Sequence, residues 1–92
     1  MIQSFRRKDA PAVYEGKSPR RFKALAKVAE RKLALFDAAH TLAFLKAPPG
    51  NRMEALKDDR KGQHSIRIND QWRICFVWTE VGPVAVEILD YH

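Results

Sequence analysis

Hydrophobic residues recur at helical spacing in the first half of the chain. Six positions stand three or four residues apart, namely Phe22, Leu25, Ala29, Leu33, Phe36 and His40. This spacing predicts one face of an amphipathic helix. Ser18 suits the N-cap of that helix and Pro19 suits its first position. Because Pro48-Pro49-Gly50 prevents continuation, we expect a helix over about 19–38 and a shorter one over 40–46.

After Gly50 the hydrophobic pattern changes to an alternation with a period of two. Together with β-branched and aromatic content, it predicts strands over 64–69, 72–78 and 84–88. The connections between these strands are short, which favours antiparallel pairing of neighbours. Weaker signals predict a short strand at 2–5, a helical turn at 12–15 and another short strand near 52–56.

Helices followed by strands are typical of an α+β fold, with N-terminal helices packed on a small antiparallel β-sheet. The helical stripe and the even-numbered strand residues are expected to form one core. The odd-numbered Arg67, Arg73 and Cys75 are then expected on the opposite, open face of the sheet. With 92 residues, the chain has the length of a single domain spanning 1–92.

The charge is positive and unevenly distributed. The chain has 17 Lys and Arg against 11 Asp and Glu, a net charge of +6, and ten of the basic residues lie within 1–35. Such an excess indicates nucleic acid, an acidic protein partner or a solvated surface, and it does not choose among them.

Membrane and secreted classes are not favoured by the sequence. No apolar run approaches the roughly 20 residues that cross a bilayer, and the N-terminus lacks the apolar region of a signal peptide. The single cysteine, Cys75, cannot form a disulfide framework. We therefore expect a cytoplasmic protein without a membrane partner.

Candidate chemistry concentrates at the end of the chain. There is no glycine-rich phosphate loop and no His/Cys cluster with metal-ligand spacing, so no metal and no cofactor are expected. The last predicted strand leads into Asp90-Tyr91-His92, three residues that can all handle protons. Elsewhere in the predicted sheet, the odd-numbered Arg67 and Arg73, with Lys57 in the loop before them, could bind a phosphodiester and stabilise charge during phosphoryl transfer. Asp90 and His92 continue the even-numbered side and Tyr91 the odd one, so all three reach one site only if the chain end bends. Composition alone leaves a solvated chain end as the alternative.

The residues that carry a family resemblance extend along the whole chain. They are the segment 56–76 with the block Ser65-Ile66-Arg67-Ile68-Asn69 before Trp72-Arg73, the start Met1-Ile2-Gln3-Ser4-Phe5, and the ending Asp90-Tyr91-His92. In these features the sequence resembles the HigB-type toxins of the RelE/ParE superfamily. The resemblance implies a microbial RNase-like fold and a toxin that enters the ribosomal A site and cleaves mRNA. It implies as partners the ribosome with its rRNA, mRNA, and a HigA-type helix-turn-helix antitoxin, through which the complex contacts operator DNA.

The resemblance also implies roles for individual residues. His92 matches the histidine of proton transfer, with Asp90 and Tyr91 as the acid and the aromatic residue beside it. Lys57 and Arg73 match basic residues that hold the scissile phosphate, and the reaction needs no metal. RNA or rRNA contacts are expected from Arg60, Lys61, His64 and Arg67. Where some relatives carry a histidine shortly before the lysine, this sequence has Glu54.

Two other functions remain open from the sequence. A ParE-like poison of DNA gyrase would use the same fold and would need no catalytic tail. A non-enzymatic module would act only as part of a repressor complex with its antitoxin. Mapping of mRNA ends in cells that express the protein distinguishes cleavage from either alternative.

Overall fold

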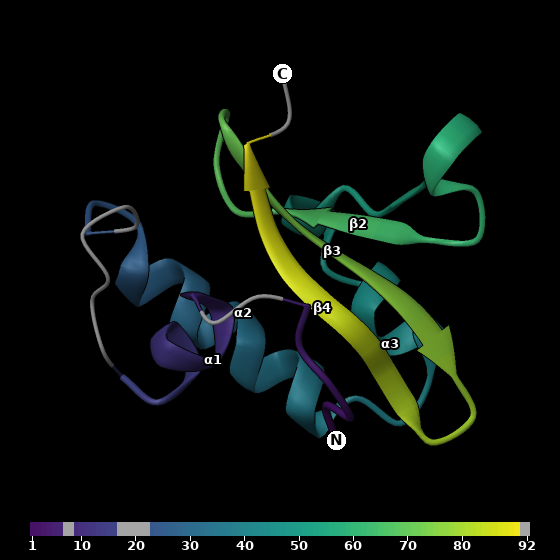
Figure 1. The fold of residues 1–92 in the computed structure, drawn as a ribbon, viewed down its shortest axis with the longest axis horizontal. Coiled ribbons are helices and arrows are strands. Elements are labelled where there is room, and N and C mark those ends of the chain that lie inside the picture. Colours follow the sequence, from purple (N-terminus) through teal and green to yellow (C-terminus); the bar gives the residue numbers. More distant parts are fainter. Residues whose placement is uncertain (7–8, 17–22, 91–92) are drawn as a thin grey trace.

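The computed structural model describes residues 1–6, 9–16 and 23–90, which form an α+β fold (Figure 1). Its helices are α1 (Asp9–Tyr14), α2 (Ala26–Ala38) and α3 (Leu42–Lys46), with two 3-10 turns, η2 (Pro49–Asn51) and η3 (Asp58–Arg60). Its strands are β1 (Glu54–Ala55), β2 (His64–Arg67), β3 (Trp72–Thr79) and β4 (Gly82–Asp90). The three α-helices precede all four strands, in the predicted order.

The strands form one antiparallel sheet in the order β1-β2-β3-β4. The predicted meander is therefore confirmed, and the weak signal near 52–56 corresponds to β1. Asn69 shapes the turn between β2 and β3, because its side-chain oxygen accepts hydrogen bonds from the backbone N–H groups of Gln71 (2.9 Å) and Trp72 (2.8 Å). Such a tight turn reverses the direction of the chain within a few residues, as antiparallel pairing of β2 and β3 requires.

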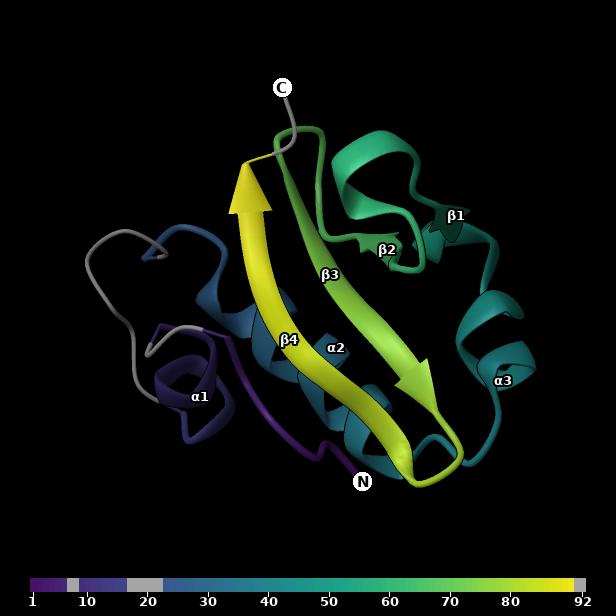
Figure 2. The same ribbon diagram turned by 45° about the vertical axis from the view of Figure 1, so that its right-hand side comes forward.

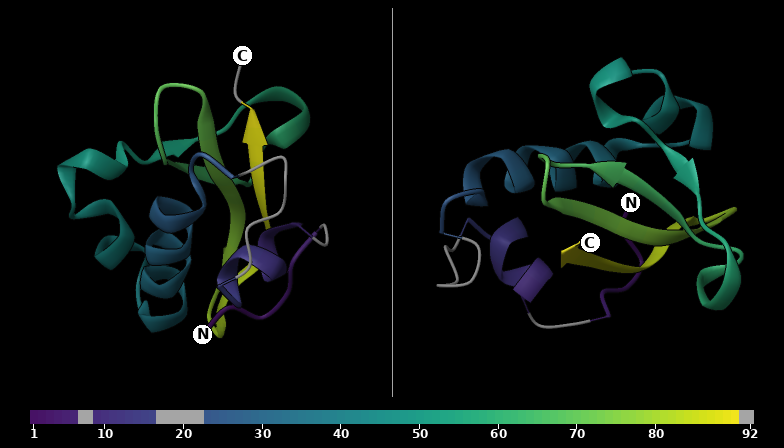
Figure 3. Two further views of the ribbon diagram at one scale, coloured as in Figure 1. Left: turned by 90° about the vertical axis from the view of Figure 1, so that its left-hand side faces the viewer. Right: turned by 90° about the horizontal axis from the view of Figure 1, so that it is seen from above.

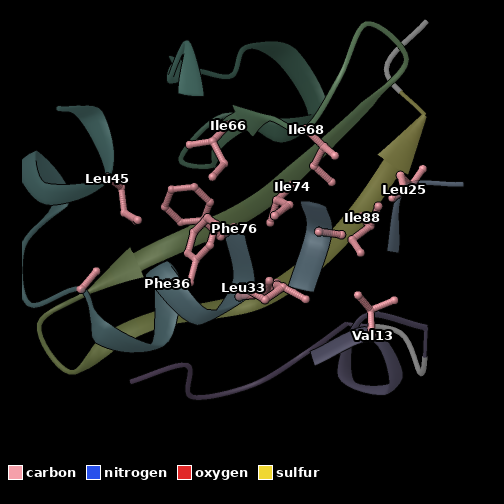
Figure 4. Close-up of a cluster of buried hydrophobic side chains, with 13 residues drawn as sticks. Val13, Leu25, Leu33, Phe36, Leu45, Ile66, Ile68, Ile74, Phe76 and Ile88 are labelled. Carbon is pink, nitrogen blue, oxygen red and sulfur yellow. The ribbon is translucent and has the colours of Figure 1, made fainter. Parts of the chain in front are cut away.

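Helix α2 packs on one face of the sheet and forms the core with it (Figure 4). The predicted stripe is buried at Leu25, Ala29, Leu33 and Phe36. Buried with them are the even-numbered strand residues Ile66, Ile74, Phe76 and Ile88, and Ile68 just after the end of β2. The rings of Phe36 and Phe76 meet edge to face with centroids 4.7 Å apart. The two periodicities thus predicted the core correctly, since each reports which side chains share a face.

The ends of the predicted helices differ from the structure. Residues 23–25 form a turn and α2 begins at Ala26, while the predicted start at 18–22 lies outside the described residues. The backbone of Ala39 is extended, so His40 leaves the helix and is exposed rather than continuing the apolar stripe. α2, with 13 residues, is the longest described helix, and none of the described helices has the length and apolarity to cross a membrane.

The N-terminal segment runs alongside β4 (Figure 2). The backbone N–H of Gln3 donates to the carbonyl of Pro83 (2.9 Å), and that of Arg6 donates to the carbonyl of Val86 (3.0 Å). The predicted strand at 2–5 is therefore an extended segment with one parallel bridge, between Phe5 and Val86.

A β-bulge interrupts the alternation of β4. Between the pairs Cys75–Glu87 and Val77–Val84, β4 has one more residue than β3. Ala85 adopts a left-handed φ of 52°, and its N–H donates to Ser4 Oγ at 2.9 Å. The extra residue reverses the parity of the strand, so Val84 faces the side of Val77 and not the core side predicted for even-numbered residues.

Gly82 is expected to be required for stability. Its φ is +130°, and a Cβ built there would lie 2.3 Å from the backbone oxygen of Met1. Gly82→Ala should therefore lower the free energy of unfolding by about 1–3 kcal/mol, from backbone strain and displacement of the N-terminal segment. Urea denaturation followed by circular dichroism measures this. Gly50→Ala is the matched control, since its Cβ would meet nothing within 4 Å; equal midpoints for the two variants would contradict the prediction.

Candidate functional site

The sheet face opposite α2 carries buried polar residues. Ser65, Cys75 and Glu87 lie across from one another in the register of β2, β3 and β4, and Arg73 follows on β3. All four are buried, Arg73 with 8% of its surface exposed. The prediction that Arg73 and Cys75 lie on the face opposite the core is therefore confirmed, but the expectation that this face is open was wrong. Two segments contact this face: the one around Arg52, through Arg73, and η3, through Glu87. η3 lies on the side of the sheet away from α2 (Figure 3).

Arg73 anchors the chain segment that leads into β1. Its Nε donates to Ser65 Oγ at 2.8 Å, and its Nη2 donates to the backbone oxygen of Arg52 at 2.6 Å. The carboxylate of Glu54 lies 3.7 Å from the same Nη2. Arg52 has a left-handed φ of 43°, and the planar guanidinium holds its carbonyl in place. The side chain of Arg73, which is predicted to hold a phosphate, therefore stabilises the fold at this position.

Glu87 is a buried carboxylate that two arginines of the described part of the chain contact. Its Oε1 accepts hydrogen bonds from Nη1 of Arg60 (2.9 Å) and from Nη1 of Arg6 (3.3 Å). The Glu87 side chain is 2% exposed, against 35% for Arg60 and 52% for Arg6. Sequence reasoning did not single out Glu87, although a signal was present: it is the only charged residue from Val84 to Leu89.

The basic residues before β2 share one tight turn. Lys57 precedes η3, and its carbonyl accepts from the N–H of Arg60 at 3.1 Å. Lys61 follows η3, and both lysines are exposed. Since Arg60 contacts Glu87, this turn lies on the same side of the sheet as Arg73.

Arg67, Arg73 and Asp90 lie toward the same end of the sheet, but the register puts Asp90 on the core side with Trp72 and the two arginines on the other face. Arg67 lies opposite Arg73, and Asp90 lies opposite Trp72. Asp90 accepts a hydrogen bond from Gln71 Nε2 at 3.0 Å. The side chain of Arg67 also forms an ion pair with Asp70, an exposed residue of the β2–β3 turn.

Two of the predicted catalytic residues, Tyr91 and His92, lie outside the described residues. What the structure places is the strand that leads to them. Asp90 ends β4 beside the β2–β3 turn, at the top of Figure 1.

His64 lies apart from the other candidates. Its ring stacks on Phe76 at 5.9 Å, so it faces the core side of the sheet rather than the side of Arg73. It lines a pocket of about 370 Å³ together with Leu42, Ala43, Lys46, Met53 and Ala55. Its Nδ1 is buried and has no hydrogen-bond partner within the described part of the chain. The structure therefore does not bring His64 together with Lys57, Arg60 and Arg73.

Cys75 has no features of a nucleophile at neutral pH. Burial raises the pKa of its thiol to about 11, with a further contribution from Glu87 that Arg60 and Arg73 oppose. The thiol therefore stays protonated at neutral pH, and the thiolate is the reactive form. The polar residues around Cys75 form charged hydrogen bonds with one another, and the thiol itself has no chemical role in this cluster.

Two similar proteins match the greater part of the chain. Toxin HigB-1 of Vibrio cholerae serotype O1 is 45% identical over 62 residues, which cover 67% of this chain and 64% of that protein. An uncharacterised protein of Haemophilus influenzae is 36% identical over 68 residues, covering 74% of this chain and 66% of that protein. The matched regions thus span slightly less than two thirds of either relative.

The match to a family is more extensive. The family described as the RelE-like toxin of the type II toxin-antitoxin system HigB matches residues 3–92. This range includes all four strands, the basic turn at η3 and the end of β4 at Asp90. Because the family match covers residues 3–92 and Toxin HigB-1 is 45% identical over two thirds of the chain, the chain belongs to the HigB-like family of RelE-like toxins.

Proposed function

We propose that this protein is a ribosome-dependent mRNA endonuclease that acts as the toxin of a type II toxin–antitoxin system. The observation that carries the proposal is the family match over residues 3–92, which includes the ending Asp90-Tyr91-His92. The fold supports it, because Lys57 and Arg60 lie on the same side of the sheet as Arg73. Positive charge beside a proton-transfer group is what phosphodiester cleavage requires.

The proposed reaction is an attack by the 2′-OH of the RNA on the adjacent phosphorus. The 2′-OH loses its proton, the bond from phosphorus to the 5′-oxygen breaks, and that oxygen gains a proton. The products are a 2′,3′-cyclic phosphate and a 5′-OH. His92 serves in proton transfer, and the carboxylate of Asp90, held by Gln71, stabilises its charged form. Lys57 and Arg73 stabilise the charge that develops on the phosphate oxygens.

Binding to the ribosome is proposed to depend on the remaining positive charge. The net charge is +6, and Arg60, Lys61 and Arg67 lie on or next to the proposed catalytic side of the sheet. Phosphate contacts of this kind dominate affinity and weaken with salt. Tyr91 is proposed to stack on an RNA base, since stacking tolerates any base. A ribosomal target places the action of the protein in the cytoplasm.

The proposed partner that controls the toxin is a HigA-type antitoxin with a helix-turn-helix domain. The complex of the two is proposed to repress its own operon, with operator DNA contacted by the antitoxin. Membership of a family of type II toxins supports an antitoxin partner.

A cleavage assay with purified components tests the proposal. Ribosomes programmed with a defined mRNA are incubated with the protein, and primer extension maps the new ends. We expect cleavage within the A-site codon only when ribosomes are present, with 5′-OH ends that polynucleotide kinase can label. Inhibition of DNA gyrase without cleavage would instead establish the gyrase poison. Operator binding with the antitoxin and neither activity would establish the non-enzymatic module.

A further inference from the structure

We propose that Glu87 is a positioning residue, which holds the turn 57–61 against the sheet so that Lys57 faces the bound phosphodiester. This inference rests on the proposed function of Lys57. Neither the family resemblance nor the sequence pattern assigned a role to Glu87. The observations that carry it are the burial of this carboxylate and the chain of hydrogen bonds from it to Lys57.

Glu87 is held in a rigid part of the fold. It lies in β4 opposite Cys75 on β3, and the next residue of β4, Ile88, is part of the hydrophobic core. On the other edge of β4, Val86 is hydrogen-bonded to the N-terminal segment through Ser4 and Arg6. A carboxylate 2% exposed is stable only with charged or hydrogen-bonding partners. Glu87 therefore needs its guanidinium partners and holds them in turn.

Arg60 is the closer of the two partners. Its Nη1 lies 2.9 Å from Glu87 Oε1, against 3.3 Å for Arg6, and its side chain is less exposed. The same Nη1 lies 3.1 Å from Oε1 of Gln63, at the far end of the loop. The Arg60 side chain thus connects β4 to Gln63, at the end of the segment that follows Lys57.

The turn transmits this restraint to Lys57 through backbone hydrogen bonds. The N–H of Arg60 donates to the carbonyl of Lys57 (3.1 Å), and the N–H of Gln63 donates to the carbonyl of Arg60 (3.0 Å). Asp58, between Lys57 and Arg60, has a left-handed φ of 56°. Asp adopts this region more readily than most other residues, and here it shapes the tight turn between Lys57 and Arg60. Once Arg60 is fixed, the position of Lys57 is fixed as well.

Glu87 itself does not reach the RNA in this scheme. Its carboxylate is buried and accepts from two guanidinium groups, so it acts through Lys57. Misplacement of a catalytic group by about 1 Å lowers rates by roughly 10²-fold. We therefore expect Glu87→Gln, which keeps the shape and removes the charge, to lower the ribosome-dependent cleavage rate by about 10–100-fold. Glu80→Gln, the same substitution in the exposed β3–β4 turn, is the matched control and should cleave at the wild-type rate.

A double-mutant cycle with Lys57 distinguishes positioning from general destabilisation. If Glu87 acts through Lys57, Glu87→Gln should lower the rate by less than about 3-fold in a Lys57→Ala background. Loss of folded protein would instead multiply the two effects. A full 10–100-fold loss in that background would overturn the proposal.

Hydrogen exchange gives a readout that does not need cleavage. In Glu87→Gln, the amides of Arg60, Lys61 and Gln63 should exchange about 10-fold faster than in the wild type, while those of Ala29 and Leu33 in α2 stay unchanged. Unchanged exchange in the turn would overturn the inference, whatever the activity. Conversely, a wild-type protein that cleaves no mRNA would refute the proposed function, and exchange would still decide whether Glu87 holds the turn.

Discussion

Replacement of His92 by alanine is expected to lower ribosome-dependent mRNA cleavage by about 10²–10⁴-fold, the usual contribution of a general acid or base. No other histidine can take over. His40 is exposed between α2 and α3, and His64 faces the core side of the sheet, away from Arg73. The variant should therefore also lose growth inhibition when it is expressed without an antitoxin.

Stability and activity can be separated in this experiment. His92→Ala should unfold at the same temperature as the wild type, since the substitution leaves every residue of the described core unchanged. His40→Ala is the matched control: it removes an exposed histidine outside the site and should retain wild-type cleavage and toxicity. Undiminished cleavage by His92→Ala in the purified system would contradict the assignment of proton transfer to this residue.

The second large effect is expected for substitutions of Arg73, which should lower the free energy of unfolding. Arg73→Ala removes the donors to Ser65 Oγ and to the carbonyl of Arg52. The buried Ser65 hydroxyl left without its donor costs about 1–3 kcal/mol, and the partly buried carbonyl of Arg52 adds a smaller cost. We therefore expect the free energy of unfolding to fall by roughly 2–4 kcal/mol, measured by urea denaturation.

Arg67 provides the comparison, because it faces Arg73 across the β2–β3 pair. Its partner Asp70 is 99% exposed, and exposed ion pairs contribute about 0–1 kcal/mol. Arg67→Ala should therefore lower stability by less than about 1 kcal/mol. If Arg73→Ala were as stable as Arg67→Ala, the structural role of Arg73 would be wrong.

Cleavage by the Arg73 variants then tests its second role. Arg73→Lys keeps the positive charge but loses the planar fork that reaches two acceptors at once. We expect it to be less stable than the wild type. Assays carried out where each variant is fully folded would show whether the charge at this position also contributes to phosphate binding.

The buried polar residues hold the backbone segments around the proposed site in defined positions. Arg73 fixes the segment Arg52–Glu54, and Glu87 fixes the turn that carries Lys57. Both charges come from neighbouring strands on the face opposite the hydrophobic core. A basic surface that was merely solvated would lack such anchors, because long side chains in water keep most of their freedom. The fold therefore supports a site with defined geometry more than a diffuse positive patch.

The sequence by itself determined the elements and the core. Helical spacing identified Leu33 and Phe36, and alternation identified Ile74 and Ile88, because local periodicity reports which side chains share a face. Resemblance over the whole length also indicated the family, which the match over 3–92 confirms. The roles predicted for Lys57 and Asp90 remain predictions.

Only the tertiary structure decided which polar residues are buried and with whom they pair. Arg60 and Glu87 are 27 residues apart in sequence, and Arg6 and Glu87 are 81 apart. No local pattern encodes contacts at such separations, so Arg73 was expected on an open face and Glu87 was not singled out. The bulge at Ala85 also had no periodic signal, since it depends on a hydrogen bond to Ser4 of the N-terminal segment. Periodicity reports the faces of single elements, whereas the site depends on contacts between elements distant in sequence.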